Sequence, residues 1–242
     1  MDTDSRSVSG DEIPFGPLEE AIFLSRPNRF VAWVELVGGH VVKAHVGDPG
    51  RMVDLLVPGR RAYVRHVPST TRATEYDLML VEYQGILVSV NTLMPNRLAA
   101  AALRGRRWEE FATCNAVRAE ARRGRSRFDF ELADGTGGRV IVEVKSVGLM
   151  RDGIGWFPDA VTARGRRHVE ELAALRREGT RTAIVFIAQR PDVEAIRSAA
   201  DIDPAFAEAL RRASADGVEL YGWRCAVSRS GIRLDRRVPV EA

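Results

Sequence analysis

The chain has 242 residues, of which 45% are hydrophobic and 29% charged, as is ordinary for a globular protein with a full core. Its formal net charge is only +3, and all but two of its 36 basic residues are arginine. Arginine forks match phosphate geometry, although a GC-rich genome produces the same bias. No apolar run is long enough to span a bilayer, and the N-terminus lacks the regions of a signal peptide. Its two cysteines form neither a metal spacing nor a disulfide framework. We therefore expect a cytoplasmic protein without a membrane partner.

The first part of the chain is predicted to form a small barrel behind a polar tail. Residues 1–16 are rich in Ser, Asp and Gly, a composition typical of disorder. From residue 17 to residue 90, short apolar runs alternate with turn residues, which suits an OB-like β-barrel. The expected strands are Phe30–Leu36, His40–His45, Arg61–Val67, Tyr76–Tyr83 and Ile86–Val90.

Residues 91–242 are predicted to form a second domain, which makes the whole chain α/β (α+β). Helical segments are expected from Pro95, near Trp108–Phe111, over Ala163–Glu178 and from Pro204, and residues 148–158 are expected to form a loop. The expected strands are Ala116–Ala121, Arg127–Leu132, Val140–Ser146, Thr182–Ala188, Val218–Val227 and Gly231–Leu234. A helix, three meandering strands, a helix and a strand form the core of the PD-(D/E)xK restriction-endonuclease-like mixed sheet.

The strand Val140–Ser146 carries the clearest chemical signal. Because side chains alternate along a strand, Glu143 and Lys145 share one face, and buried charges are costly unless they are paired or bound to metal. A turn-rich hairpin connects this strand to the one that carries Asp129, and the residues Phe128, Phe130 and Leu132 are expected on the opposite face of that strand. Two carboxylates and a lysine around one point can form a metal-dependent phosphodiesterase site.

Each residue of this group has an expected role. Asp129 and Glu143 are the expected ligands of Mg²⁺ or Mn²⁺, and Lys145 would orient the attacking water or stabilise phosphate charge. Glu120, on the preceding strand, is a candidate third ligand, with an exposed strand carboxylate as the alternative. The alternative for the whole group is a structural ion-pair cluster on a sheet surface.

Nucleic-acid contacts are expected from arginine-rich segments in both parts of the chain. One arginine run surrounds the hairpin that leads into Asp129 and can follow a phosphate backbone, although such a run also fits a solvated face. In the first part, basic residues lie near Phe30 and Trp33, a mixture typical of OB surfaces that bind nucleic acid. For His168 the alternative is a solvent-facing helical histidine. The expected contacts are Arg29, Arg51, Arg125, Arg127, Arg164, His168 and Gln189.

Several motifs in one order resemble the sugar fermentation stimulation protein A family over nearly the whole chain. They are Arg26-Pro27-Asn28-Arg29-Phe30, His45…Pro49-Gly50-Arg51, Val90-Asn91-Thr92, Pro95-Asn96-Arg97-Leu98, Ser126-Arg127-Phe128-Asp129-Phe130, Glu143-Val144-Lys145-Ser146-Val147, Phe157-Pro158-Asp159-Ala160-Val161-Thr162 and Arg164-Gly165…His168. The resemblance implies an N-terminal OB-like domain, a C-terminal nuclease-like domain and DNA binding. The family has been tied to regulation of sugar utilisation genes and carries a predicted DNA/RNA nuclease label.

The chain departs from the family pattern at three places. Val46-Gly47-Asp48 stands where the family commonly has Cys-Pro-Asn, and Gly148 stands where it often has Thr. Ala101 stands where the family often has an acidic residue, so a third carboxylate from that helix is absent.

The sequence therefore predicts a nucleic-acid-binding protein, with DNA favoured over RNA, that hydrolyses phosphodiesters with Mg²⁺ or Mn²⁺. The alternative is a non-catalytic DNA-binding regulator of sugar (maltose-type) metabolism genes. In that case the acidic cluster would be structural. The sequence leaves the oligomeric state open, with a homodimer as one option.

Overall fold

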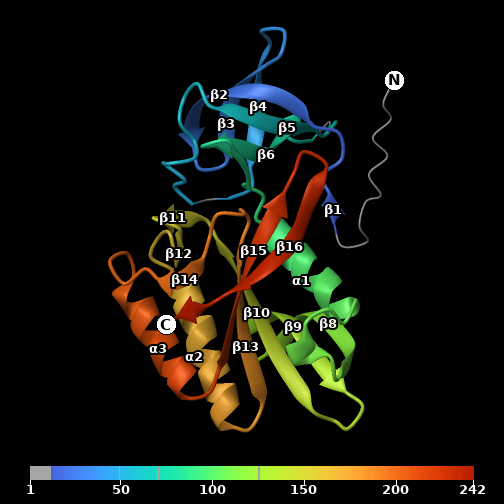
Figure 1. The fold of residues 1–242 in the computed structure, drawn as a ribbon, viewed down its shortest axis with the longest axis vertical. Coiled ribbons are helices and arrows are strands. Elements are labelled where there is room, and N and C mark those ends of the chain that lie inside the picture. The colour runs from blue at the N-terminus through green and yellow to red at the C-terminus, as the bar shows by residue number, and fades with distance from the viewer. Residues whose placement is uncertain (1–11, 49, 70, 125) are drawn as a thin grey trace.

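The computed structural model describes residues 12–48, 50–69, 71–124 and 126–242 and has an N-terminal barrel above a larger α/β domain (Figure 1). The barrel strands follow the order β4-β3-β2-β5-β6-β7, and an additional parallel pairing of β4 with β6 closes five of them into a ring. Their bounds are β2 (Glu19–Asn28), β3 (Val31–Leu36), β4 (Val41–Val46), β5 (Arg61–His66), β6 (Tyr76–Tyr83) and β7 (Ile86–Ser89). The expected OB-like barrel is confirmed.

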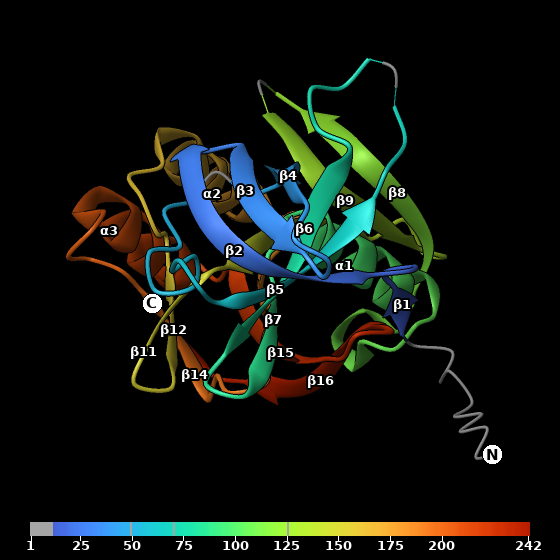
Figure 2. The ribbon, with the colours of Figure 1, turned by 90° about the horizontal axis from the view of Figure 1, so that it is seen from above.

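Alternating side chains fill the barrel. Ala32 and Val34 of β3 are fully buried and contribute to a separate barrel core. Gly38 and Gly39 turn β3 into β4 with φ of 111° and 85°, values that favour glycine. Figure 2 looks down on this barrel, with the second domain beneath it.

The residues just before the barrel correct the expected tail. The strand β1 (Ile13–Pro14) pairs antiparallel with β16 (Gly231–Val238), and the side chain of Phe15 is only 1% exposed. The prediction of disorder is therefore wrong for residues 13–16, because two apolar side chains are buried there. Residues 1–11 lie outside the described part.

A seven-stranded mixed sheet forms the centre of the second domain. Its order is β1-β16-β15-β13-β10-β9-β8, with β10, β13 and β15 parallel to one another. Such apolar parallel strands are buried on both faces. The bounds are β8 (Cys114–Arg123), β9 (Ser126–Asp134), β10 (Arg139–Val147), β13 (Arg181–Ala188) and β15 (Glu219–Val227).

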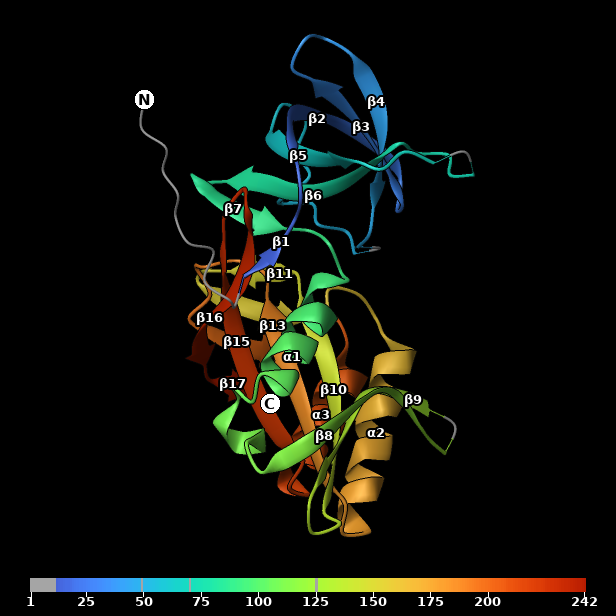
Figure 3. The same cartoon turned by 90° about the vertical axis from the view of Figure 1, so that its right-hand side faces the viewer.

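Helices cover both faces of this sheet (Figure 3). The helix α1 (Met94–Arg104) packs Leu98 and Ala102 in one core cluster with Val142 and Val144, and the short 3₁₀ helix η1 (Glu109–Phe111) follows it. On the other face, α2 (Ala163–Arg177) and α3 (Pro204–Ala215) belong to a second cluster that includes Ile141. The restriction-endonuclease-like arrangement is confirmed.

The expected loop over residues 148–158 contains a hairpin instead. The strands β11 (Leu149–Arg151) and β12 (Ile154–Phe157) pair antiparallel and join β14 (Ala195–Ser198) and β17 (Val240–Glu241) in a small second sheet. The turn is made by Asp152 and Gly153, both with positive φ. Its strands are too short for a sequence pattern to reveal.

One carboxylate links the starts of both helices on the α2 face. The Asp203 side chain accepts hydrogen bonds from the backbone N–H groups of Phe206 in α3 (2.9 Å) and Thr162 (2.8 Å), and Thr162 itself caps α2 by accepting from Gly165 (3.0 Å). These caps satisfy backbone donors that a helix start leaves unpaired and thereby fix where α2 begins. Among the described residues, no helix is long and apolar enough to cross a membrane.

Candidate metal and catalytic site

The site lies where β9 and β10 separate. Their pairing ends with Val142 opposite Phe130, and beyond this point the Asp129 carboxylate bridges the strands, with Oδ2 accepting from the Val144 N–H at 2.8 Å. Phe130 belongs to the core on the α1 face, as does Leu132, whereas Phe128 belongs to the core on the α2 face. The expectation that these three side chains share one face is therefore wrong.

Glu143 and Lys145 lie on the α2 face of β10, as the alternation predicts. Glu143 is only 4% exposed, and its Oε1 accepts a hydrogen bond from Lys145 Nζ at 2.6 Å. His168 of α2 places Nδ1 2.6 Å from the same oxygen, and since an ionised carboxylate only accepts, this nitrogen donates. His168 is 3% exposed, with its ring against Phe128, so it holds Glu143 and does not face solvent.

The two carboxylates differ in their electrostatic environment. Burial and the nearby charge of Glu143 raise the pKa of Asp129, against the hydrogen bonds from Val144 and Asn96, which lower it. Burial also tends to raise the pKa of Glu143, but the hydrogen bond from His168 and the charge of Lys145 outweigh it and hold that pKa below its usual value. A cation between the carboxylates would relieve their repulsion.

The residues present fit a hard divalent cation. Glu143 Oε2 is buried and has no hydrogen-bond partner, which is costly for a charged oxygen unless a ligand binds it. Among the described residues, no group of three or more His, Cys, Asp and Glu side chains could hold a metal ion. Mg²⁺ usually needs only one or two carboxylates and keeps several waters, so Asp129 and Glu143 are a sufficient pair.

Asn96 is a site residue that the sequence did not single out. Its Nδ2 donates to Asp129 Oδ1 at 2.8 Å from the first turn of α1. The motif Pro95-Asn96-Arg97-Leu98 was the available signal, but only the fold shows that α1 begins beside β9. Ala101, further along the helix, packs against the core and supplies no carboxylate.

The structure does not bring Glu120 to this pair. Glu120 has a φ of 55° within β8, its side chain is 69% exposed, and its carboxylate lies 3.4 Å from Arg127. The left-handed backbone turns it outward, which corrects its expected role as a ligand. Arg127 is half exposed, and Arg125 lies outside the described residues.

The other predicted contacts divide into exposed and buried groups. Arg29, Arg51 and Arg164 are exposed and can reach a ligand. Gln189 is buried, with Nε2 donating to Ser146 (3.2 Å) and Oε1 accepting from Ser89 of the barrel (2.8 Å). Gln189 therefore fastens the barrel to β10 and β13 and does not point into solvent.

Asp129, together with Glu143 and Lys145 on the inner strand β10 of a mixed sheet, is the arrangement of a restriction-endonuclease-like protein of the PD-(D/E)xK class, here preceded by an OB-like barrel. A family model described as "Sugar fermentation stimulation protein RE domain" matches residues 93–231, and one described as "SfsA N-terminal OB domain" matches residues 24–90. The chain belongs to the sugar fermentation stimulation protein family, as the motifs predicted.

Relatives and a solved structure agree with this assignment. The chain is 44% identical over 226 residues to a "Sugar fermentation stimulation protein homolog" of Chloroflexus aurantiacus, covering 93% of this chain and 86% of that protein. It is 42% identical over 234 residues to the homolog of Desulforamulus reducens, covering 97% of both. The structure of Pyrococcus furiosus SfsA in complex with Ca²⁺ matches with a TM-score of 0.87 and 30% identity over 97% of this chain and all of that one.

Proposed function

We propose that this protein binds nucleic acid and hydrolyses its phosphodiester bonds with Mg²⁺ or Mn²⁺ held by Asp129 and Glu143. The observation that carries this proposal is the buried Oε2 of Glu143, which has no hydrogen-bond partner, beside the half-buried carboxylate of Asp129 and the amine of Lys145. The Ca²⁺ complex of the Pyrococcus furiosus relative supports a divalent cation, since Ca²⁺ and Mg²⁺ both prefer oxygen ligands.

Some residues of the site orient the two carboxylates, and Lys145 acts on the water and the phosphate. A bound divalent cation would lower the pKa of water and neutralise phosphate charge. The Asn96 amide and the Val144 N–H orient Asp129, while His168 orients Glu143. Lys145, 12% exposed, places its ammonium where it can orient the attacking water and stabilise negative charge on the phosphate.

Exposed arginines supply the proposed binding surface. Arg127 near the β8–β9 turn and Arg164 in the first turn of α2 are exposed on the elements that carry the site. Arg51 is exposed on the barrel and has no ion-pair partner among the described side chains. One guanidinium group can bind two phosphate oxygens at once through two parallel N–H donors. The proposed substrate is nucleic acid, with DNA preferred over RNA.

The test is cleavage of labelled single- and double-stranded DNA and RNA with Mg²⁺, Mn²⁺ or EDTA. Cleavage should require metal and fall about 100-fold or more in Lys145→Ala and Asp129→Asn. Glu208→Gln is the matched carboxylate control, because the Glu208 side chain is 41% exposed on α3 and pairs with Arg211 and Arg212 of the same helix, outside the proposed site. Tight DNA binding without cleavage under any metal would instead favour the non-catalytic regulator of sugar metabolism genes.

A further inference from the structure

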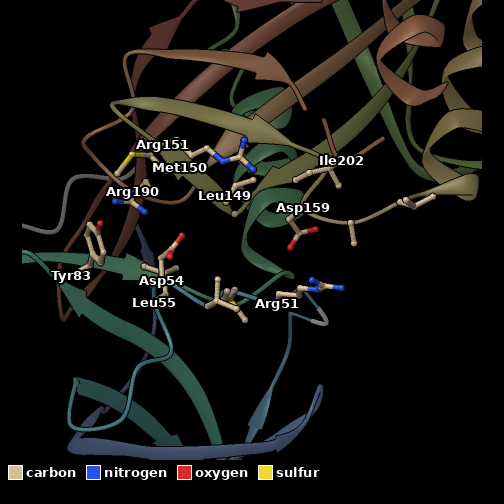
Figure 4. A pocket seen from close by; sticks show the side chains of 15 residues that line it. Arg51, Asp54, Leu55, Tyr83, Leu149, Met150, Arg151, Asp159, Arg190 and Ile202 are labelled. Carbon is tan, nitrogen blue, oxygen red and sulfur yellow. The ribbon is translucent and has the colours of Figure 1, made fainter. Parts of the chain in front are cut away.

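A pocket of about 460 Å³ opens between the barrel and the second domain (Figure 4). Its barrel side is formed by residues 51–55, which follow β4, together with Tyr83 of β6. Its other side is formed by residues 148–151 at the start of the small sheet and by residues 159–161 ahead of α2. A cleft of this size between two domains is a common place for a small planar ligand.

Apolar side chains from both domains form the pocket walls. Met52 and Leu55 line the barrel side, and Leu149, Met150 and Val161 line the opposite side. Val161 is 76% exposed although it is apolar, and Leu149 and Met150 are only half-buried. Two apolar surfaces that face each other across an open cleft favour binding of a flat aromatic ring, because the ring covers both surfaces and removes them from water.

Two charged groups in the pocket have no side-chain hydrogen-bond partner among the described residues. The Asp159 carboxylate accepts a hydrogen bond from its own backbone N–H, and Figure 4 shows it turned toward the barrel segment that carries Arg51. Burial raises the pKa of Asp159 although the charge of the nearby Arg26 guanidinium lowers it, and N–H donors from a ligand would further stabilise the ionised form. Arg51 has no ion-pair partner within the described part of the chain, whereas Arg151 and Arg190 are each paired with an aspartate.

The barrel segment is held in place before any ligand binds. The guanidinium of Arg26 donates to the backbone carbonyls of Gly50 (2.6 Å) and Asp48 (2.7 Å), and the Asp48 side chain accepts from the Gly50 N–H (2.7 Å). Gly50 lies so close to Asp159 that an added Cβ would be 1.8 Å from Oδ2. Such preorganisation lowers the entropic cost of ordering a binding loop.

The pocket also lies close to the proposed catalytic site along the chain. Leu149 follows Lys145 by four residues, so an extended chain places them at most about 14 Å apart. Successive nucleotides of a B-form strand are separated by about 3.4 Å along the helix axis. One strand can therefore place a phosphate at the site and a nearby base in the pocket.

We propose that this pocket binds one unstacked guanine base of the nucleic-acid substrate, a few nucleotides from the phosphate at Asp129 and Glu143. The ring lies between the apolar walls, its N1–H and amino N–H donate to the Asp159 carboxylate, and its phosphate meets Arg51. Guanine fits because its Watson–Crick edge offers two adjacent donors to the two carboxylate oxygens. This inference rests on the proposed function and adds a base preference to it.

The first test is binding of dGMP, dAMP, dCMP and dTMP to the full chain in EDTA, measured by calorimetry. We expect dGMP to bind at least about tenfold more tightly than dTMP, and Asp159→Asn to abolish this preference. Asp152→Asn is the matched control, because Asp152 is exposed, lies outside the pocket lining, and has a φ of 50° that asparagine tolerates. Equal affinity for the four nucleotides would overturn the inference.

A second pair of variants tests the pocket at two exposed positions outside the core, one in the pocket lining and one away from it. Val161→Trp fills the cleft and should abolish dGMP binding, while Val37→Trp, at an 80% exposed position beyond β3, should leave it unchanged. In short dT strands with one dG, the cleavage position should follow the dG in the wild type and not in Val161→Trp. Cleavage that ignores the dG, without dGMP binding, would overturn the pocket and leave the nuclease proposal standing. Guanine-selective dGMP binding without any cleavage would support the pocket and remove the nuclease proposal.

Discussion

His168 shows how one buried side chain can set the chemistry of its neighbour. Because its hydrogen bond helps hold the pKa of Glu143 below the usual value, His168→Ala should raise that pKa. We expect the acid limb of the cleavage pH profile to move to higher pH, and activity to fall about 10- to 100-fold, as is typical when a residue that orients a metal ligand is lost.

The measurement is the rate against pH at saturating and at limiting Mn²⁺. His168→Gln keeps a donor and should recover part of the loss, while Arg164→Ala, one turn earlier on the exposed face of α2, should leave the acid limb in place. An acid limb that stays fixed in His168→Ala would mean that His168 has only a packing role.

Much of the site can be read from the sequence because it depends on local rules. Strand alternation places Glu143 and Lys145 together, and a hairpin brings Asp129 beside them. Asn96 donates to Asp129 from α1 and His168 donates to Glu143 from α2, on opposite faces of the sheet. Only tertiary packing sets that geometry. The outward turn of Glu120 depends on one left-handed φ, which a strand pattern does not reveal.

The short strand β1 adds an edge strand to the sheet, although the composition of this segment predicts disorder. Phe15 directly after it is 1% exposed, whereas Phe30 in the barrel is 50% exposed. Phe15→Ala should lower the free energy of unfolding by about 3 kcal/mol, since it leaves a cavity, and Phe30→Ala should change it by less than about 0.5 kcal/mol. Urea unfolding of the two variants compares them, and equal small losses would show that β1 contributes little to stability.

The pairing of β13 with β15 includes an ion pair whose contribution depends on pH. Arg181 donates two hydrogen bonds of 2.8 Å to the Glu219 carboxylate, and Tyr221 donates a third. Burial tends to raise the pKa of Glu219, but these hydrogen bonds outweigh it and lower that pKa below its ordinary 4.5. The stabilisation is therefore present above about pH 4.5 and is lost as the pH falls through the lower, folded-state pKa.

Glu219→Gln removes this dependence. At neutral pH the variant should be less stable than the wild type by about 1 kcal/mol, because the pair is partly exposed. The difference in unfolding free energy should shrink toward zero as the pH falls from about 7 to about 3. A difference that stays constant over this range would exclude the charge of Glu219 as its source.

At the level of the whole molecule, two domains that the sequence separates share one core. The cluster on the α1 face of the sheet includes Tyr63, Met79 and Leu80 from the barrel along with Met94 and Leu98 from α1. The polar contact of Ser89 with Gln189 lies at the same junction. Sequence patterns assign each strand to its domain by local alternation, so they do not show that barrel side chains continue the core of the other domain.

This shared core predicts that the barrel and the second domain unfold together. Met79 is fully buried in β6 and belongs to the shared cluster, so Met79→Ala should lower the free energy of unfolding by about 2 to 5 kcal/mol. Hydrogen exchange followed at β3 and at β10 should then accelerate by the same factor in both, because one cooperative transition exposes them. Val34→Ala, in the separate barrel core, is a second test and should also accelerate exchange in both strands. Faster exchange in β3 alone would show that the barrel unfolds as an independent unit. In that case the pocket between the domains could open while the sheet that carries Asp129 and Glu143 stays folded.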